Sequence, residues 1–329
     1  GVANMAEYHY DDGSVYGFPT KYENSRWILI NEDMFKEAGL DIPYDGWTYS
    51  EFLADAEKLT HGEGQDKVYG VCWARKQSGK SILYALDGVL GANQIYKNEE
   101  GTEVNFDNDV YRAGLNLVKE TLDKGYAIPI EDEFSEDISV ANTFLQGKCA
   151  IMLGVAQMRL CMDQENYPHD FMTALVPAPV PDDEKYNTEF YRKQIGTTGA
   201  GDLLSISANT KYPEASFEFA MWYLKGGMSP LVKGGRIPLW NGVNKDEVLS
   251  VLKEKAQGSI DMDSMENYLS LDTTQGVAAI KGHASSEISS AWFEEFDAMC
   301  YGKQSVDQTV QNMEKRGNEL IQTELSSQK

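Results

Sequence analysis

Residues 12–60 constrain the fold most, because strand and helix patterns alternate within them at short intervals. The run RWILIN at residues 26–31 contains four consecutive apolar residues and predicts a buried strand. Residues 32–38 place apolar side chains on one helical face and precede a glycine, so they predict a short helix. The T-x-x-E spacing that opens residues 48–59 is typical of a helix with a capping box. Strands that alternate with helices favour an α/β layered fold.

The same alternation continues to the end of the chain. Pro19 is expected to end the first strand or to place it at a sheet edge, because proline cannot donate to a strand ladder. Residues 181–193 are polar and predict a surface loop. The other predicted strands are residues 15–19, 68–73, 149–153 and 203–207. The other predicted helices are residues 81–90, 107–124, 139–145, 213–225, 246–256, 288–300 and 305–325.

Length and charge restrict the architecture and the partners. A chain of 329 residues exceeds the usual size of a single core and therefore predicts two lobes. Its 52 acidic side chains against 29 basic ones give a net charge of −23. This charge repels nucleic acids and anionic lipid headgroups, so neither is expected as a partner. No apolar run is long enough to span a bilayer, and the first residues lack the pattern of a signal peptide.

The sequence carries no motif of catalytic or cofactor-binding chemistry. The cysteines form no C-x-x-C pair and the histidines no H-x-x-x-H spacing, so we expect free buried thiols and no metal. S-G-K-S at residues 78–81 lacks the first glycine of a phosphate loop, and G-A-G at 199–201 precedes a strand instead of following one. No cofactor and no catalytic residue are predicted. Paired carboxylates of a glycosidase remain the enzyme alternative, which the abundance of acids neither supports nor excludes.

Eight short motifs occur in the order found in one protein family, and together they cover nearly the whole chain. They are DGSVYGFP at residues 12–19, INEDMFKEAGL at 30–40, WTYSEF at 47–52 with KLT at 58–60, FLQGKCAIM at 144–152, VPAPVP at 176–181, the glycine-bearing segment 196–207, a helix with A-x-x-x-F-x-x-W-x-L at 215–224, and the helix pair around 292–306. In this order the chain resembles the carbohydrate-type extracellular solute-binding proteins of bacterial ABC importers, the maltodextrin-binding-like group.

The resemblance implies an α/β, two-lobe, periplasmic-binding-protein-like fold of type II. The opening portion of family members has no counterpart in this chain, so the resemblance implies an incomplete N-terminal lobe. The lobes would be joined by two or three crossings and would close over a ligand by hinge bending. The implied N-terminal lobe comprises residues 1–19 and 204–251, the C-terminal lobe residues 24–196 and 252–329, and the crossings residues 19–24, 196–203 and 250–256.

The resemblance also implies a function. The protein would bind an extracellular carbohydrate, with an oligosaccharide expected, in the cleft between the lobes and deliver it to ABC transporter permease subunits. It would be a monomer on the outer or periplasmic face of the cytoplasmic membrane, lipid-anchored in the full-length protein, and it would not be an enzyme. The alternatives are a binding protein for a non-sugar solute and a polysaccharide-acting hydrolase or lyase.

The candidate site residues follow from the chemistry of a saccharide and from the implied cleft. A sugar presents an apolar face and a rim of hydroxyls, so its site needs an aromatic surface and polar side chains. Trp73 ends a predicted strand and Arg75 lies just beyond it, and strand carboxyl ends face the ligand crevice in open α/β sheets; a place at the rim is the alternative for Trp73. Glu23 lies where the resemblance implies a polar ligand contact, with a structural role at the hinge as the alternative.

Two more groups of candidates flank the implied second crossing. Gln157 and Arg159 follow the FLQGKCAIM motif, where the resemblance implies an aromatic that this chain lacks; they would bind polar groups instead. Gly199 and Gly201 allow close approach of the backbone to a ligand. Asp202 would accept hydrogen bonds from hydroxyls. A simple turn is the alternative for the last three.

The remaining candidates lie in the C-terminal half. Trp240 and Asn241 share a loop with Arg236. Trp292 lies on a predicted helix near Glu287, and a place in the core is the alternative for the tryptophan. The tryptophans expected in the core are Trp27, Trp47 and Trp222.

Overall fold

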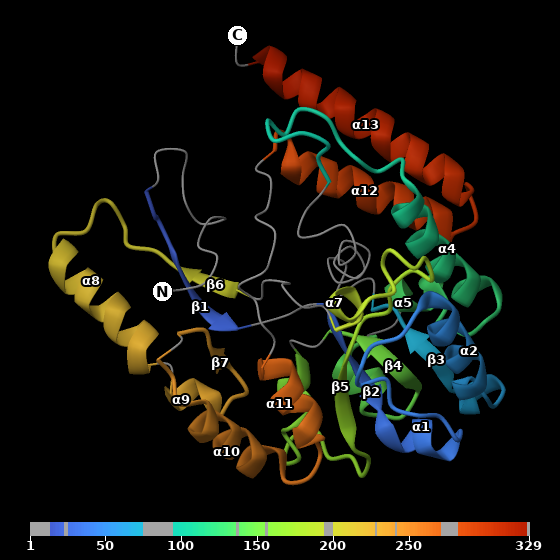
Figure 1. Ribbon diagram of the computed structural model, residues 1–329, viewed down its shortest axis with the longest axis horizontal. Helices are drawn as coiled ribbons and strands as arrows, with labels where there is room; N and C mark the ends of the chain where they lie inside the picture. The colour runs from blue at the N-terminus through green and yellow to red at the C-terminus, as the bar shows by residue number, and fades with distance from the viewer. Residues whose placement is uncertain are drawn as a thin grey trace.

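The computed structural model describes residues 14–22, 26–74, 95–135, 138–154, 157–193, 200–227, 229–240, 242–270 and 282–327. The protein contains two separate sheets with helices around them (Figure 1). The smaller sheet has the strand order β6-β1-β7 and the larger one β3-β4-β2-β5. The predicted α/β class is therefore confirmed.

The larger sheet is mixed. β2 (Trp27–Asn31) runs antiparallel to both of its neighbours, β4 (Cys149–Leu153) and β5 (Thr173–Pro177). β3 (Tyr69–Cys72) pairs with β4 in parallel. All five residues of β2 are buried. A strand buried on both faces reads as a continuous apolar run, which is why the sequence predicted this strand correctly.

Each face of the larger sheet has its own core. Ile28 and Ile30 point into the cluster that contains Phe52 and Trp292, whereas Leu29 belongs to the other cluster. On the first face lie α1 (Glu32–Glu37), α2 (Tyr49–Leu59), α4 (Asp109–Asp123), α12 (Ser285–Cys300) and α13 (Val306–Ser327). On the second face lie the π-helical turn Val140–Phe144, α6 (Met158–Cys161), α10 (Lys245–Ala256) and α11 (Met262–Ser270).

The position of α10 bears on the expected lobes. This helix buries Val248, Leu252 and Ala256 in the same cluster as Leu29, so it packs on the larger sheet. The implied third crossing, residues 250–256, falls inside the helix, and the lobe boundaries stay a prediction. The remaining short elements are the 3₁₀ turn Gly64–Asp66, α5 (Ile130–Ser135) and α7 (Glu189–Arg192), of which the last lies in the predicted loop 181–193.

A capping box begins α2, as the sequence predicted. The Thr48 hydroxyl accepts a hydrogen bond from the Glu51 amide (3.3 Å), and the Glu51 carboxylate accepts one from the Thr48 amide (2.7 Å). We expect Thr48→Ala to lower the free energy of unfolding by about 1 kcal/mol, because one of these two bonds is lost. Urea denaturation measures the change. Thr323→Ala, at an exposed threonine inside α13, is the control and should stay within about 0.5 kcal/mol; equal losses in both variants would contradict the role of the cap.

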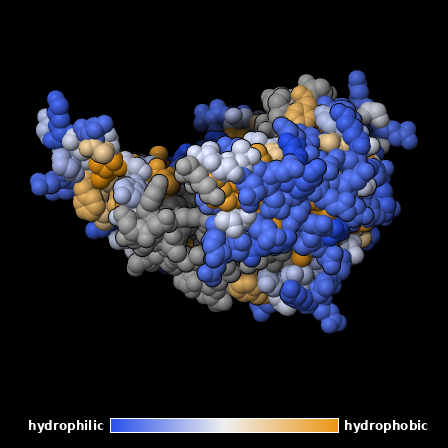
Figure 2. Space-filling model, turned by 90° about the horizontal axis from the view of Figure 1, so that it is seen from above, coloured by the Kyte–Doolittle hydropathy of each residue, from blue (hydrophilic) through white to orange (hydrophobic). Residues whose placement is uncertain are grey.

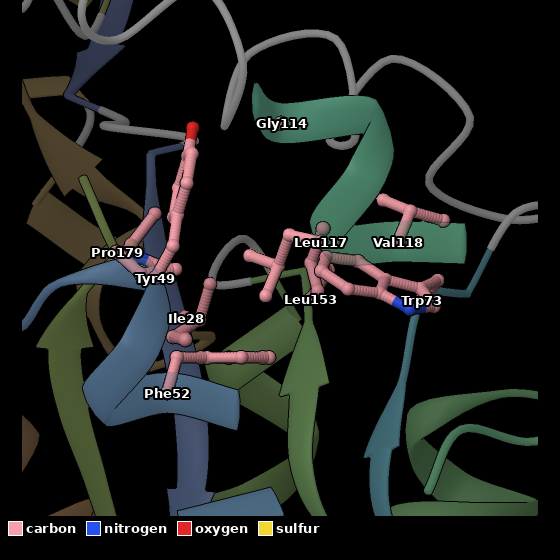
Figure 3. A pocket seen from close by; sticks show the side chains of 10 residues that line it. Ile28, Tyr49, Phe52, Trp73, Gly114, Leu117, Val118, Leu153 and Pro179 are labelled. Carbon is pink, nitrogen blue, oxygen red and sulfur yellow. The ribbon is translucent and has the colours of Figure 1, made fainter. Parts of the chain in front are cut away.

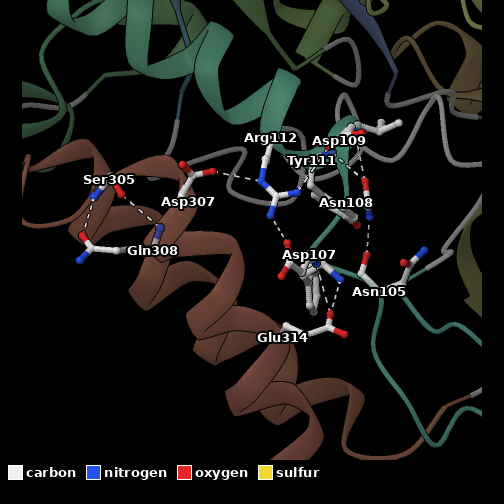
Figure 4. A network of polar contacts seen from close by, with 12 residues as sticks. Asn105, Asp107, Asn108, Asp109, Tyr111, Arg112, Ser305, Asp307, Gln308 and Glu314 are labelled. Carbon is white, nitrogen blue, oxygen red and sulfur yellow. Dashed lines mark hydrogen bonds and ion pairs between the residues drawn. The ribbon is translucent and has the colours of Figure 1, made fainter.

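Polar contacts dock the start of α4 on α13 (Figure 4). The Asn108 side chain caps α4 by accepting from the amides of residues 110 and 111, both at 3.0 Å. The Glu314 carboxylate of α13 accepts from the Phe106 amide at 2.8 Å, and Arg112 of α4 donates to Asp307 at 3.1 Å. A second capping box, with the S-x-x-Q spacing, opens α13.

The smaller sheet is antiparallel. β1 (Phe18–Tyr22) lies between β6 (Ala200–Leu204) and β7 (Ile237–Pro238). Pro19 does not end β1, and the alternative expectation, a place at a sheet edge, describes its end of the strand. β7 pairs only with Lys21 and Tyr22, so the Pro19 end of β1 has one partner strand and needs no donor on its other side. The strand predicted at residues 203–207 is also displaced, because pairing with β1 begins at residue 200.

The helix α8 (Pro213–Trp222) exposes aromatic side chains. It continues into a π-helical turn, Tyr223–Gly227, and is followed by α9 (Ser229–Val232). Trp222 is 58% exposed and Phe219 56%, and apolar residues gather at the projecting end of the molecule that carries α8 (Figure 2). Trp222 was predicted to lie in the core, which is wrong. Helical spacing identifies an apolar face but does not identify what covers it.

Candidate functional site

One edge of the larger sheet meets the connection to the smaller sheet. β3, β4 and β5 end at this edge, whereas the antiparallel β2 begins there. β1 ends at Tyr22 in the smaller sheet and β2 begins at Trp27 in the larger one, so the chain crosses between the sheets over a few residues. Ligands of open α/β sheets bind outside the carboxyl ends of strands. This edge and the crossing therefore form the candidate site region.

An apolar recess lies at this edge (Figure 3). It holds about 10 Å³ of free space, roughly what one water molecule needs, and apolar atoms line it. Trp73 stands on one side of the recess and Tyr49 on the other. The other lining residues are Ile28, Phe52, Gly114, Leu117, Val118, Leu153, Ala178 and Pro179.

Trp73 is a wall of this recess instead of an open platform. Its side chain is 4% exposed, its ring lies 5.7 Å from that of Phe52, and its indole N–H donates to the Thr121 hydroxyl at 2.9 Å. Among the described residues the buried Tyr49 hydroxyl has no hydrogen-bond partner, and burial raises the pKa of Tyr49. The recess is therefore a packing gap beside the sheet edge, and a stacking role for Trp73 stays a prediction.

Three aromatic rings pack together at the two ends of the crossing. The Tyr22 hydroxyl donates to the Tyr268 carbonyl at 2.9 Å, and their rings meet edge to face at 5.2 Å. The Trp27 ring lies 5.3 Å from Tyr268. Burial raises the pKa of Tyr22, which keeps the phenol neutral at physiological pH. Tyr268 of α11 therefore contacts both Tyr22, where the crossing begins, and Trp27, where it ends.

An ionic cluster lies beside the crossing, on the smaller sheet. The Asp202 carboxylate accepts a hydrogen bond from Arg236 and lies 3.6 Å from the Lys21 ammonium. Asp202 has a φ of +53°, a conformation that costs an ordinary residue about 1–2 kcal/mol. Its carbonyl accepts from the Thr20 hydroxyl at 2.7 Å. The backbone and side chain of Asp202 are therefore both held by β1 and by the turn before β7.

Gln157 and Arg159 approach this cluster from the larger sheet. The Arg159 guanidinium donates to the Gln157 side-chain oxygen at 3.0 Å. Gly235, with a φ of +78°, packs so closely on α6 that a β-carbon there would lie 2.7 Å from the β-carbon of Arg159. Because Gly235 precedes Arg236, the fold brings these two arginines onto neighbouring segments. Lys21, Gln157, Arg159, Asp202 and Arg236 are named the crossing cluster below.

The other candidates are dispersed. Trp240 follows β7 and is 37% exposed, with its ring over Gly242. Glu287 is exposed in the first turn of α12. Trp292 is 2% exposed and stacks on Phe296, with ring centroids 4.9 Å apart and planes at 12°. Trp292 thus occupies the core, which the sequence left open as its alternative position.

Four candidates lie outside the described residues, namely Glu23, Arg75, Gly199 and Asn241. Gly201 is described as part of β6, where it pairs with Lys21. Sequence reasoning missed Lys21, Tyr22 and Tyr268, and named Arg236 only as a neighbour of Trp240. No local pattern marks these residues, since each acquires its role from a segment far away in the chain.

Metal ligands, reactive thiols and membrane-spanning helices are the other features of the described residues that bear on function. Within them, no group of three or more His, Cys, Asp or Glu side chains is arranged to hold a metal ion. The four cysteines are free, as predicted; Cys72, Cys149 and Cys161 are buried and Cys300 is half-buried. Burial raises the pKa of the Cys161 thiol to about 12, so it is unreactive at neutral pH. No helix in the described ranges is long and apolar enough to cross a membrane.

Two sheets joined by a short crossing, with polar side chains beside it, define a solute-binding architecture. Residues 2–225 match the family profile of the bacterial extracellular solute-binding proteins, and the chain belongs to this family. The resemblance inferred from the motifs is thereby confirmed.

Solved structures share this fold. A sugar transporter from Rhizobium etli in an open conformation matches with a TM-score of 0.68 at 17% identity, over 97% of this chain and 74% of that one. An ABC substrate-binding protein from Listeria monocytogenes in complex with cycloalternan gives 0.68 at 17%, over 97% and 75%. The sugar-binding protein MalE from Xanthomonas citri gives 0.64 at 17%, over 98% and 76%. The fold is therefore of the MalE-like type II class.

Proposed function

We propose that this protein binds an extracellular carbohydrate, and specifically an oligosaccharide, between its two sheets and delivers it to an ABC permease. Membership of the solute-binding family is the observation that carries the proposal. The saccharide class is supported by structural neighbours that contain cycloalternan or, in the case of a solute-binding protein from Agrobacterium vitis, D-mannitol. The crossing cluster supplies polar side chains of the kind that saccharide hydroxyls bind.

Binding would proceed by closure of two lobes around the crossing. The lobes proposed are those expected from the sequence, with Gln157 and Arg159 on one side and Asp202 on the other. A ligand that contacts both sides stabilises the closed arrangement by its differential affinity for it. We further propose that the protein is a monomer that acts on the extracellular or periplasmic face of the membrane, lipid-anchored in its full-length form, without catalysis or cofactor.

Ligand binding should raise the thermal stability of the protein. A ligand at about 100 times its dissociation constant adds about 2.7 kcal/mol to the free energy of unfolding, because it binds the folded state alone. We expect such a shift with at least one member of an oligosaccharide panel in thermal unfolding. Chromatography of the released ligand should recover it intact.

Two results would contradict this function. Cleaved products that accumulate at a steady turnover would favour the hydrolase or lyase. A thermal shift with amino acids or peptides, and with no saccharide of the panel, would favour a binding protein for a non-sugar solute. A mock purification from cells that do not express the protein, incubated with the same glycans, is the control for contaminating hydrolases.

A further inference from the structure

The charge around the crossing differs from the charge of the whole chain. The chain carries −23, yet among the described residues the crossing cluster holds the cations Lys21, Arg159 and Arg236 beside the Asp202 carboxylate. A cationic site inside an acidic protein attracts an anionic group only at short range, since distant charges are screened by salt. The feature therefore concerns direct contact with a ligand.

Arg159 has most of its hydrogen-bonding capacity unused. A guanidinium carries five N–H donors, and among the described residues Arg159 donates only to Gln157. No described carboxylate lies within ion-pair distance of it, and its side chain is exposed. The Gln157 contact holds the guanidinium at the start of α6, beside the turn that carries Arg236.

Arg236 is held from the opposite side. Its amide donates to the Leu231 carbonyl at 3.1 Å, and the Gly235 amide donates to Val232 at 2.8 Å, so a tight turn fixes the backbone. Its guanidinium engages Asp202 through one nitrogen and stays 45% exposed. Asp202 is shared with Lys21, so one negative charge faces two cations in this part of the cluster.

The two arginines thus come from different units of the fold and lie on segments that pack against each other, because Gly235 contacts Arg159. Guanidinium groups bind carboxylates and sulfates through paired N–H bonds, which makes arginine the usual partner of planar or tetrahedral oxyanions. We propose that Arg159 and Arg236 bind an anionic group of the saccharide, so that the ligand is an acidic oligosaccharide that bears a uronate carboxylate or a sulfate ester. This inference rests on the proposed carbohydrate function and specifies its substrate class.

The test compares charged and neutral saccharides of the same skeleton. Calorimetric titration would use uronate oligosaccharides of pectin, alginate and glucuronoxylan type, each beside its carboxyl-reduced neutral counterpart. We expect at least one acid to bind roughly tenfold or more tightly than its counterpart, because a charge-assisted bidentate contact is lost on reduction. The preference should weaken as salt is raised, since both guanidinium groups are solvent-exposed.

Substitutions test whether the two arginines cause the preference for acidic saccharides. Arg159→Gln with Arg236→Gln should remove the preference for the acid, so that the acid and its neutral counterpart bind with equal affinity. Arg159→Lys with Arg236→Lys should restore the preference in part, because the charge returns without the paired geometry. Arg192→Gln is the matched control, because the Arg192 guanidinium binds Glu51, Asn187 and the Gly46 carbonyl and no member of the crossing cluster. Circular dichroism melting verifies that all variants fold.

The outcomes separate this inference from the function on which it rests. Binding of neutral saccharides as tightly as acidic ones overturns the inference and leaves carbohydrate binding intact. A preference for acids that survives in the double glutamine variant also overturns it. Sulfated maltotriose, run against maltotriose, distinguishes a sulfate ligand from a carboxylate one. Absence of binding by every saccharide overturns both proposals.

Discussion

Trp292→Ala is expected to lower the free energy of unfolding by about 3–5 kcal/mol, which is the cost of removing a buried tryptophan from a packed core. The side chain is 2% exposed, stacks on Phe296 and meets Phe293 edge to face at 5.2 Å. It belongs to the core between the larger sheet and the helices α12 and α13. Urea denaturation followed by circular dichroism measures the loss.

A matched exposed tryptophan provides the control. Trp222→Ala, at a side chain that is 58% exposed, should change the same free energy by about 0.5 kcal/mol or less. Trp292→Phe keeps most of the buried area and should bind the saccharide with unchanged affinity. If that variant folds stably but loses affinity, Trp292 is a ligand contact and its assignment to the core is wrong.

Local patterns in the sequence predicted the elements well. The capping boxes at Thr48 and at Ser305 form as their spacing indicated. Gly125, with a φ of +69°, ends α4 as expected of a glycine beyond a helix. Each of these features involves residues that are close in the chain, so a short motif contains all the information that the structure uses.

Non-local pairing explains most of the errors. The strand predicted at residues 203–207 forms at Ala200–Leu204, because its register is set by β1 at the other end of the chain. Similarly, α8 has the apolar pattern of a packed helix, yet Trp222 is exposed. Periodicity along the chain indicates that one face of a helix is apolar. Which segments pack on that face depends on the rest of the chain, so the pattern cannot predict whether the face is buried.

The candidate site shows the same contrast between residues that local motifs predict and residues whose role depends on distant segments. Gln157 and Arg159 were predicted from their place after a motif, and Asp202 from its place on the implied second crossing. In the structure Asp202 binds Arg236, and the neighbouring Gly235 packs on Arg159. Lys21 was not predicted, because its role depends on Asp202. The Thr20–Asp202 contact that accompanies it joins residues 182 positions apart. No spacing rule reaches across such a separation.

Glu295 joins α12 to α13, and its loss should destabilise this pair of helices. Its carboxylate accepts from Arg316 at 2.7 Å and from the amides of Gln304 and Asn312, both at 2.9 Å. The side chain is 12% exposed. We expect Glu295→Ala to lower the free energy of unfolding by about 2–3 kcal/mol, because three donors lose a charged acceptor. Glu294→Ala is the control: this neighbour binds the same arginine but is 67% exposed, so about 0.5 kcal/mol or less is expected.

The pH dependence of the same contact has a definite sign. Desolvation raises the pKa of Glu295, but the hydrogen bonds from Arg316, Gln304 and Asn312 outweigh it and hold the pKa below its ordinary value of 4.5. A group with a depressed pKa in the folded state stabilises the protein above its unfolded-state pKa and loses this contribution as pH falls through the folded-state value. Wild type should therefore exceed Glu295→Gln in stability at pH 7, and the gap should narrow below pH 4.5. A gap that stays constant from pH 7 to pH 3 in urea denaturation would show that the ionised carboxylate contributes nothing, since only an ionisable acceptor can produce the change.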